Sequence, residues 1–159
     1  MSTFGDYVHA ILEQGREEAR QDGSAAVEAQ HLLLAVAAGP QAAPRQVLAT
    51  AGLDHRVIRD ALDREFEHSL QAAGVSAATF DLPQPSRSPQ RPRRLGASAR
   101  LAIERGATSG RKKDLQPAHL LLGILQAEVG TVPRALALAG IDRTDLADRA
   151  RRSLAGTVR

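Results

Sequence analysis

The sequence predicts an all-helical protein built from two copies of one four-helix unit. Apolar residues make up 43% of the chain but aromatic residues only 3%. A core of Ala, Leu, Val and Ile suits closely spaced helices better than sheets. The segment HLLLAVAAGPQAAPRQVLATAGLD (31–54) also aligns without gaps to HLLLGILQAEVGTVPRALALAGID (119–142), with nine of 24 positions identical. Apolar residues recur at helical spacing, and no segment shows the alternation of a strand.

The first two helices of the first copy are defined by an apolar stripe and by glycine. The expected stripe of the first helix consists of Val8, Ile11, Leu12, Gly15 and Ala19. We expect this helix to end at Gly23. A second helix carries His31 and the three leucines after it, and it should stop near Gly39-Pro40.

The third and fourth helices have clear start and stop signals. Pro44 suits the first turn of a short helix, because its missing N–H would be unpaired there. Gly52 suits the left-handed position just past the end of that helix, near Ala51. Asp54 should cap the fourth helix. The expected buried face of the fourth helix consists of Val57, Ile58, Ala61, Leu62 and Phe66.

The second copy repeats these signals at an offset of 88 residues. Pro117 starts the helix that carries the second His-Leu-Leu-Leu segment, and Pro133 should open the third helix. Gly140 then closes the third helix and Asp142 caps the fourth. The apolar positions expected to face inward in the first and last helices are Ala99, Ala102, Ile103, Gly106, Leu146 and Leu154.

We expect one domain over residues 1–159, with a first repeat at 1–72, a linker at 73–95 and a second repeat at 96–159. Residues 81–95, DLPQPSRSPQRPRRL, contain four of the eight prolines of the chain. Proline removes backbone donors, and the segment lacks apolar anchors. We therefore expect an irregular, poorly packed connection that is more mobile than the helices.

The charge is unevenly distributed along the chain. Residues 1–82 carry a net charge of −6 and residues 96–159 a net of +5, and between them lie Arg87, Arg91, Arg93 and Arg94. These arginines could bind nucleic acid or an acidic protein, or they could simply form a solvated linker. Because no aromatic residue for base stacking lies among them, we favour the solvated linker and do not expect nucleic acid as a partner.

The sequence lacks the usual residues of catalysis. It has no Cys, no G-x-S-x-G elbow, no phosphate-binding loop and no H-E-x-x-H motif. We therefore expect no catalytic residues, no cofactor and no metal. No apolar run is long enough to span a membrane and the N-terminus lacks the features of a secretory signal, so we expect a cytoplasmic protein without a membrane partner.

His31 and His119 are the most conspicuous polar residues, because they occupy equivalent positions in the two copies. They could form a paired ligand or metal site. Alternatively, each could begin a buried helix and bond to the backbone, which we favour because two histidines are too few for a typical closed zinc site.

The chain resembles the Clp N-terminal repeat, which reads F-T-x-x-A-x-x-x-L-x-x-A-x-x-x-A and then G-x-x-x-[IV]-x-[TS]-E-H-[IL]-L-L. The residues in register are Phe4, Leu12, Gly15, Ala19, Gly23, Val27, His31, Leu32, Leu33 and Leu34, and the second copy matches through LQPAHLLLGIL. The resemblance implies a pseudo-twofold bundle of eight helices. It also implies a domain that receives substrates and adaptors for hexameric AAA+ unfoldases such as ClpA, ClpB and ClpC. In the ClpC branch, the Glu before each His also binds phosphorylated arginine.

The chain departs from the family pattern at the positions of those glutamates. Gln30 stands in the first and Ala118 in the second, and Ala29 stands where a capping Thr or Ser is usual. A guanidinium group needs a carboxylate for a charge-assisted pair. We therefore expect weak or undetectable binding of phospho-arginine. We still treat Gln30, His31, Ala118 and His119 as the candidate positions for a ligand or partner.

Two functions remain open from the sequence. The chain could be a non-catalytic module that docks protein substrates, adaptors or Clp subunits, either as an unfoldase N-terminal domain or as a stand-alone accessory or decoy. Alternatively, it could be a duplicated helical scaffold reused to bind a small molecule or an unrelated regulatory protein. In either case we expect the isolated domain to be a monomer.

Overall fold

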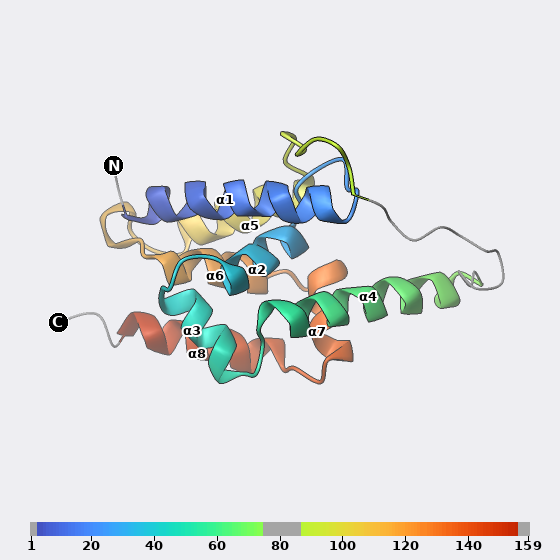
Figure 1. The fold of residues 1–159 in the computed structure, drawn as a ribbon. Helices are drawn as coiled ribbons and strands as arrows, with labels where there is room; N and C mark the ends of the chain where they lie inside the picture. Colours follow the sequence, from blue (N-terminus) through green and yellow to red (C-terminus); the bar gives the residue numbers. More distant parts are fainter. Residues whose placement is uncertain (1–2, 75–86, 156–159) are drawn as a thin grey trace.

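In the computed structural model, residues 3–74 and 87–155 are described, and they form eight α-helices and one short 3₁₀ helix (Figure 1). The helices are Thr3–Gln21 (α1), Ala29–Ala38 (α2), Ala43–Thr50 (α3), His55–Ala72 (α4), Ala97–Thr108 (α5), Pro117–Leu125 (α6), Thr131–Leu138 (α7) and Arg143–Ala155 (α8), and the 3₁₀ helix is Lys112–Asp114 (η1). Within the described ranges, the only β pairing is an isolated parallel bridge between Val27 and Leu95. The predicted all-helical class is confirmed.

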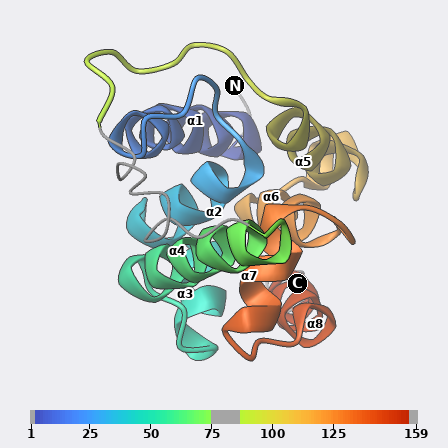
Figure 2. The same cartoon turned by 90° about the vertical axis from the view of Figure 1, so that its right-hand side faces the viewer.

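The two four-helix units pack on each other around one core. Figure 2 shows α1 and α5 in one layer, α2 and α6 in the next, and the remaining helices below them, with α4 beside α7 and α3 beside α8. Eight of the ten residues of α2 and eight of the nine of α6 are buried. A helix that is apolar on all sides belongs at the centre of a bundle. The duplicated four-helix bundle expected from the sequence is thus confirmed.

Equivalent signals end α3 and α7 and begin α4 and α8. Gly52 and Gly140 have φ values of 76° and 74°, a left-handed conformation that costs glycine little. Two residues after Gly52, the Asp54 carboxylate accepts a hydrogen bond from the backbone N of Val57 at 2.8 Å. Asp142 accepts one from the backbone N of Thr144 at 2.9 Å. These local predictions were correct, although α7 begins two residues before Pro133, the residue expected to open it.

The predicted buried face of α4 was partly wrong. Phe66 is 52% exposed and Val57 is 36% exposed. The residues of α4 that are buried are Ile58, Ala61, Leu62 and Glu65. A carboxylate therefore occupies the last inward position, and Phe66, one residue and about 100° further round the helix, faces outward.

Over the part of the linker that the structure describes, residues 87–94 have the expected irregular backbone, but the expectation of poor packing was wrong. Residues 75–86 lie outside the described ranges. Residues 87–96, however, run along the end of α1 and are hydrogen bonded there. Val27 N donates to Arg94 O at 2.9 Å, and Gly96 N donates to Val27 O at 2.8 Å. Arg91 pairs with Glu17 of α1 at 3.0 Å. These backbone hydrogen bonds and the ion pair with the acidic end of α1 hold the basic segment in place. The proposed repeat and linker boundaries remain predictions.

Candidate functional site

The two predicted histidines have the same place at the starts of equivalent helices. His31 and His119 are the third residues of α2 and α6. The Nδ1 atom of His31 accepts a hydrogen bond from the backbone N of Glu28 at 2.9 Å, and Nδ1 of His119 accepts one from Gln116 N at 2.9 Å. Each imidazole thus satisfies a backbone donor that a helix start would otherwise leave unpaired.

The other ring nitrogen of each histidine has a different environment. His31 Nε2 lies 2.8 Å from the Asp22 carboxylate. His119 instead lies against Gly110, where an added Cβ atom would come within 2.8 Å of Nε2. The repeat therefore duplicates the helix start but not the polar network around it.

The remaining two candidate positions differ in accessibility. Gln30 is half-buried and lines a surface cavity, whereas Ala118 is only 1% exposed. Among the linings of the four main cavities of the described residues, Gln30 appears in one, and His31, Ala118 and His119 appear in none. The structure does not gather these residues at one of these cavities, and a binding role for Gln30, His31, Ala118 and His119 remains a prediction.

The cap of α2 also lies one residue earlier than the sequence comparison placed it. Glu28, not Ala29, is the N-cap residue. Ala29 N donates to the hydroxyl of Ser98 at 2.8 Å, and that hydroxyl donates to the Glu28 carboxylate at 2.7 Å. Ser98 belongs to α5, so a residue of the second repeat completes the cap of a helix in the first. This contact joins residues about 70 positions apart and has no local signal in the sequence.

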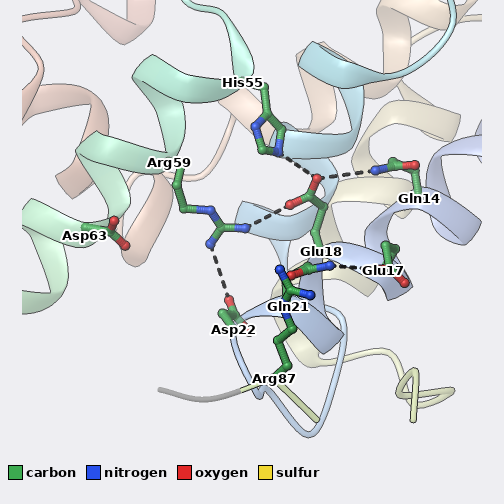
Figure 3. A pocket seen from close by; sticks show the side chains of 9 residues that line it. All are labelled: Gln14, Glu17, Glu18, Gln21, Asp22, His55, Arg59, Asp63 and Arg87. Carbon is green, nitrogen blue, oxygen red and sulfur yellow. Dashed lines mark hydrogen bonds and ion pairs between the residues drawn. The ribbon is translucent and has the colours of Figure 1, made fainter. Parts of the chain in front are cut away.

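A buried carboxylate joins α1 to α4 at the floor of an open cleft (Figure 3). Glu18 is 4% exposed, and its Oε1 lies 2.7 Å from His55 Nε2. Its Oε2 accepts a hydrogen bond from Arg59 Nη2 at 2.8 Å. Sequence analysis missed Glu18, although its spacing from Ile11 and Gly15 places it beside the apolar stripe of α1. A charged residue at such a position is the signal that could have found it.

Asp22 extends this network toward α2. Besides the contact with His31, its carboxylate accepts hydrogen bonds from Ser24 and lies 3.8 Å from Arg59. Burial alone would raise the pKa of Asp22, but the hydrogen bonds from His31 and Ser24 outweigh burial and hold the pKa below its usual value. Arg59 therefore lies between two carboxylates, and both of its neighbours are fixed by other partners.

Two adjoining cavities form a groove along α4, which we call the α4 groove. The larger, of about 590 Å³, lies between α1 and α4 and is lined by Gln14, Glu17, Glu18, Gln21, Asp22, His55, Arg59, Asp63 and Arg87 (Figure 3). The smaller, of about 220 Å³, extends toward α7 and is lined by Asp22, Ser24, Gln30, Arg59, Leu62, Asp63, Glu65, Phe66 and Thr131. The cavities share Asp22, Arg59 and Asp63. With histidine neutral, five carboxylates and two guanidinium groups give the lining a net charge of −3.

One of these carboxylates is not paired. No hydrogen bond or ion pair is formed by Asp63 within residues 3–74 and 87–155, and Figure 3 shows its side chain apart from the network. Burial raises the pKa of Asp63 above its usual value; Arg59 lowers it, and the nearby Asp60 and Asp22 raise it. Asp63 is thus a solvent-accessible carboxylate without a direct partner among the described residues.

The groove offers no activated nucleophile. Ser24 donates its hydroxyl hydrogen bond to Asp22, not to a histidine, so it lacks the base that nucleophilic catalysis requires. Among the described residues, no group of three or more His, Asp or Glu side chains could hold a metal ion. No helix within these ranges combines the length and the hydropathy needed to cross a bilayer. What the groove does offer is hydrogen-bonding groups and negative charge on a surface open to solvent.

Comparison with known structures identifies the fold class as that of Clp-type N-terminal domains. The N-terminal domain of the chaperone ClpD from Arabidopsis thaliana superposes with a TM-score of 0.66 at 20% identity, covering 97% of this chain and 96% of that one. A structure from preliminary investigations of a malarial protein secretion system gives a TM-score of 0.63 at 14% identity, covering 99% and 98%. No curated protein matches the sequence.

The family model of the Clp repeat (R) N-terminal domain matches residues 3–92, more than half of the chain. The chain therefore belongs to the Clp repeat N-terminal domain family, as the sequence resemblance indicated.

Proposed function

We propose that the chain is a non-catalytic module of the Clp system that docks protein substrates or adaptors. The observation that carries this proposal is the open α4 groove. Gln30, at the start of α2, lies in its lining. The chain that forms this groove belongs to the Clp repeat family. The absence of an activated nucleophile from the groove favours binding over catalysis. Transient protein interfaces are about as polar as the rest of a protein surface, so a polar lining is compatible with protein docking.

The alternative of a scaffold reused for a small molecule has less support. The volume of the larger cavity falls within the range of about 300–1,000 Å³ that is usual for ligand pockets. Such pockets are mostly lined by apolar and aromatic side chains, however, whereas Glu, Asp, Gln, His and Arg side chains line this one.

Site-specific crosslinking tests the proposal directly. The chain has no Cys, so one introduced thiol is a unique attachment point for a photo-crosslinker. Gln30→Cys places the probe in the groove, and Glu104→Cys places it on the exposed side of α5 as a control. We expect an unfolded protein, such as a reduced and carboxymethylated one, to crosslink at position 30 and much less at position 104. Equal labelling at both positions, or none at either, would contradict docking in the groove.

A second measurement distinguishes an adaptor or decoy from a module that receives substrates. A purified Clp ATPase from the same source should bind the immobilised chain if the chain serves as an adaptor or decoy, and the Gln30→Cys probe should then crosslink to it. Crosslinking to unfolded protein alone would indicate a substrate-receiving module.

A further inference from the structure

Most charges in the α4 groove are already neutralised by the chain itself. Glu18 is paired with Arg59 and His55, as described above. Glu65 accepts a hydrogen bond from Arg134 at 2.9 Å and another from Ser69 at 2.6 Å. Of the carboxylates in the smaller cavity, Asp63 alone has neither a hydrogen bond nor an ion pair to a described residue.

The neighbour of Asp63 on the groove is an exposed aromatic ring. Phe66 follows Asp63 by three residues on α4, and side chains at this spacing lie on the same side of a helix. Both line the smaller cavity, and about half of the phenylalanine is exposed. A free carboxylate beside an open aromatic face is the combination that binds an ammonium or guanidinium group.

An anionic ligand does not fit the smaller cavity. Arg59, the cation in its lining, is held by Glu18 and Asp22. Arg134, outside the lining, is paired with Glu65 of the lining. Arg87 forms no ion pair with a described residue, but it lines only the larger cavity. A phosphate in the smaller cavity would therefore meet carboxylates without gaining an available cation.

We propose that the smaller cavity of the α4 groove binds the cationic side chain of an unmodified, basic segment of a protein partner, with Asp63 pairing the charge and Phe66 stacking against it. Gln30 offers an amide donor and acceptor beside the cavity, which suits the backbone of an extended segment. A protein segment, rather than a free small cation, fits because the groove continues into the larger cavity between α1 and α4. This inference rests on the proposed function and names the chemistry of the segment that docks.

Fluorescence anisotropy with a matched pair of peptides tests the proposal. The first peptide is Gly-Leu-Arg-Leu-Arg-Gly with a fluorescent label on its N-terminal amine and an amidated C-terminus. The second carries citrulline for both arginines, which keeps the shape and removes the charge. We expect the arginine peptide to bind at least about tenfold more tightly than the citrulline peptide, because a charge-assisted pair is lost.

Variants of the chain locate the effect. Asp63→Asn should weaken binding of the arginine peptide by about five- to tenfold and leave the citrulline peptide unchanged. Phe66→Leu keeps an apolar side chain but removes the aromatic face, and it should weaken the arginine peptide by about two- to fivefold. The matched control is Asp60→Asn, which removes the same charge one turn of α4 earlier, outside the groove lining. It should change the affinity by less than about twofold.

The other possible results of these experiments would overturn the cation-binding proposal, the proposed docking function or both. Equal binding of the two peptides, or equal effects of Asp63→Asn and Asp60→Asn, would overturn the proposal, since the attraction would then be non-specific. Displacement of the peptide by spermidine or argininamide at similar concentrations would also overturn it, in favour of a small-cation site. If unfolded protein crosslinks at position 30 while neither peptide binds, this inference fails and the proposed function stands. If unfolded protein does not crosslink either, both fail.

Discussion

The buried carboxylate of Glu18 should stabilise the fold as well as form the floor of the groove. Glu18→Gln keeps the size of the side chain and removes its charge. The variant removes the carboxylate charge that strengthens two hydrogen-bonding contacts, to His55 at 2.7 Å and to Arg59 at 2.8 Å. A hydrogen bond to a charged group contributes about 1.5–3 kcal/mol to stability.

The expected cost lies below the sum of two such bonds. The side chains of Arg59 and His55 are 25% and 40% exposed, so water can solvate them in the variant. Gln can also still accept one hydrogen bond. We therefore expect Glu18→Gln to lower the free energy of unfolding by about 1.5–3 kcal/mol. For a chain of this length, this corresponds to a fall in Tm of about 3–12 °C.

Urea unfolding followed by circular dichroism measures this change, and Asp60→Asn is the control. Asp60 is exposed and forms no ion pair or hydrogen bond with a described residue, so its substitution should change stability by less than about 0.5 kcal/mol. A loss of under 0.5 kcal/mol for Glu18→Gln would refute the reasoning, because the network would then contribute no more than a surface ion pair. So would a loss as large in the control as at position 18.

Three other predictions concern the helix starts, the acid stability and the packing. Gln30→Glu should strengthen binding of phospho-arginine by about ten- to hundredfold, as measured by calorimetry, because it restores one charged hydrogen-bonding partner; no gain would show that the pocket differs in more than this residue. Ala118→Glu is not a comparable test, since it would place a carboxylate at a buried position. Asp22→Asn should lower the free energy of unfolding at pH 7 and reduce the stability that is lost in acid. The reason is that the depressed folded-state pKa of Asp22 contributes stability that is complete above its unfolded pKa, about 3.9, and disappears as the pH falls through the folded value. The same acid dependence in urea unfolding of both proteins would contradict this. Gly123→Ala should lower the free energy of unfolding in urea by about 1–3 kcal/mol. The added Cβ would lie 2.0 Å from the backbone O of Ala102, so α5 and α6 would have to separate. Unchanged stability would show that the two helices can shift freely.

The parts of the fold that could be predicted were those with local signals. Gly52 with Asp54, and Gly140 with Asp142, mark the ends and starts of helices through the conformation and side chain of single residues. The His-Leu-Leu-Leu segments identified the central helices because they are apolar on every side. Such signals do not depend on what packs against the helix, so they could be recognised without the structure.

The parts that could not be predicted depend on contacts distant in sequence. The cap of α2 needs Ser98, about 70 residues away. Segment 87–95 is rich in proline and arginine, and it is held by Glu17 and by backbone hydrogen bonds with Val27, both distant in sequence. Glu18 and Glu65 look like ordinary polar residues of amphipathic helices, yet both are buried with a charged partner. Their inward spacing was visible, but their partners were not.

The second repeat places different groups at the positions that form the α4 groove in the first, although α4 and α8 begin 88 residues apart behind equivalent Asp caps. At that offset Arg151 stands in α8 where Asp63 stands in α4, and it pairs with Asp148 at 2.8 Å. Ala118, at the position equivalent to Gln30, is buried. A cationic segment would therefore meet a positive charge in the second repeat, where the first offers a carboxylate. If the first repeat holds the binding site, calorimetry should give one arginine peptide per chain, and a stoichiometry of two would mean that the duplicated helix starts, not the α4 groove, bind the peptide.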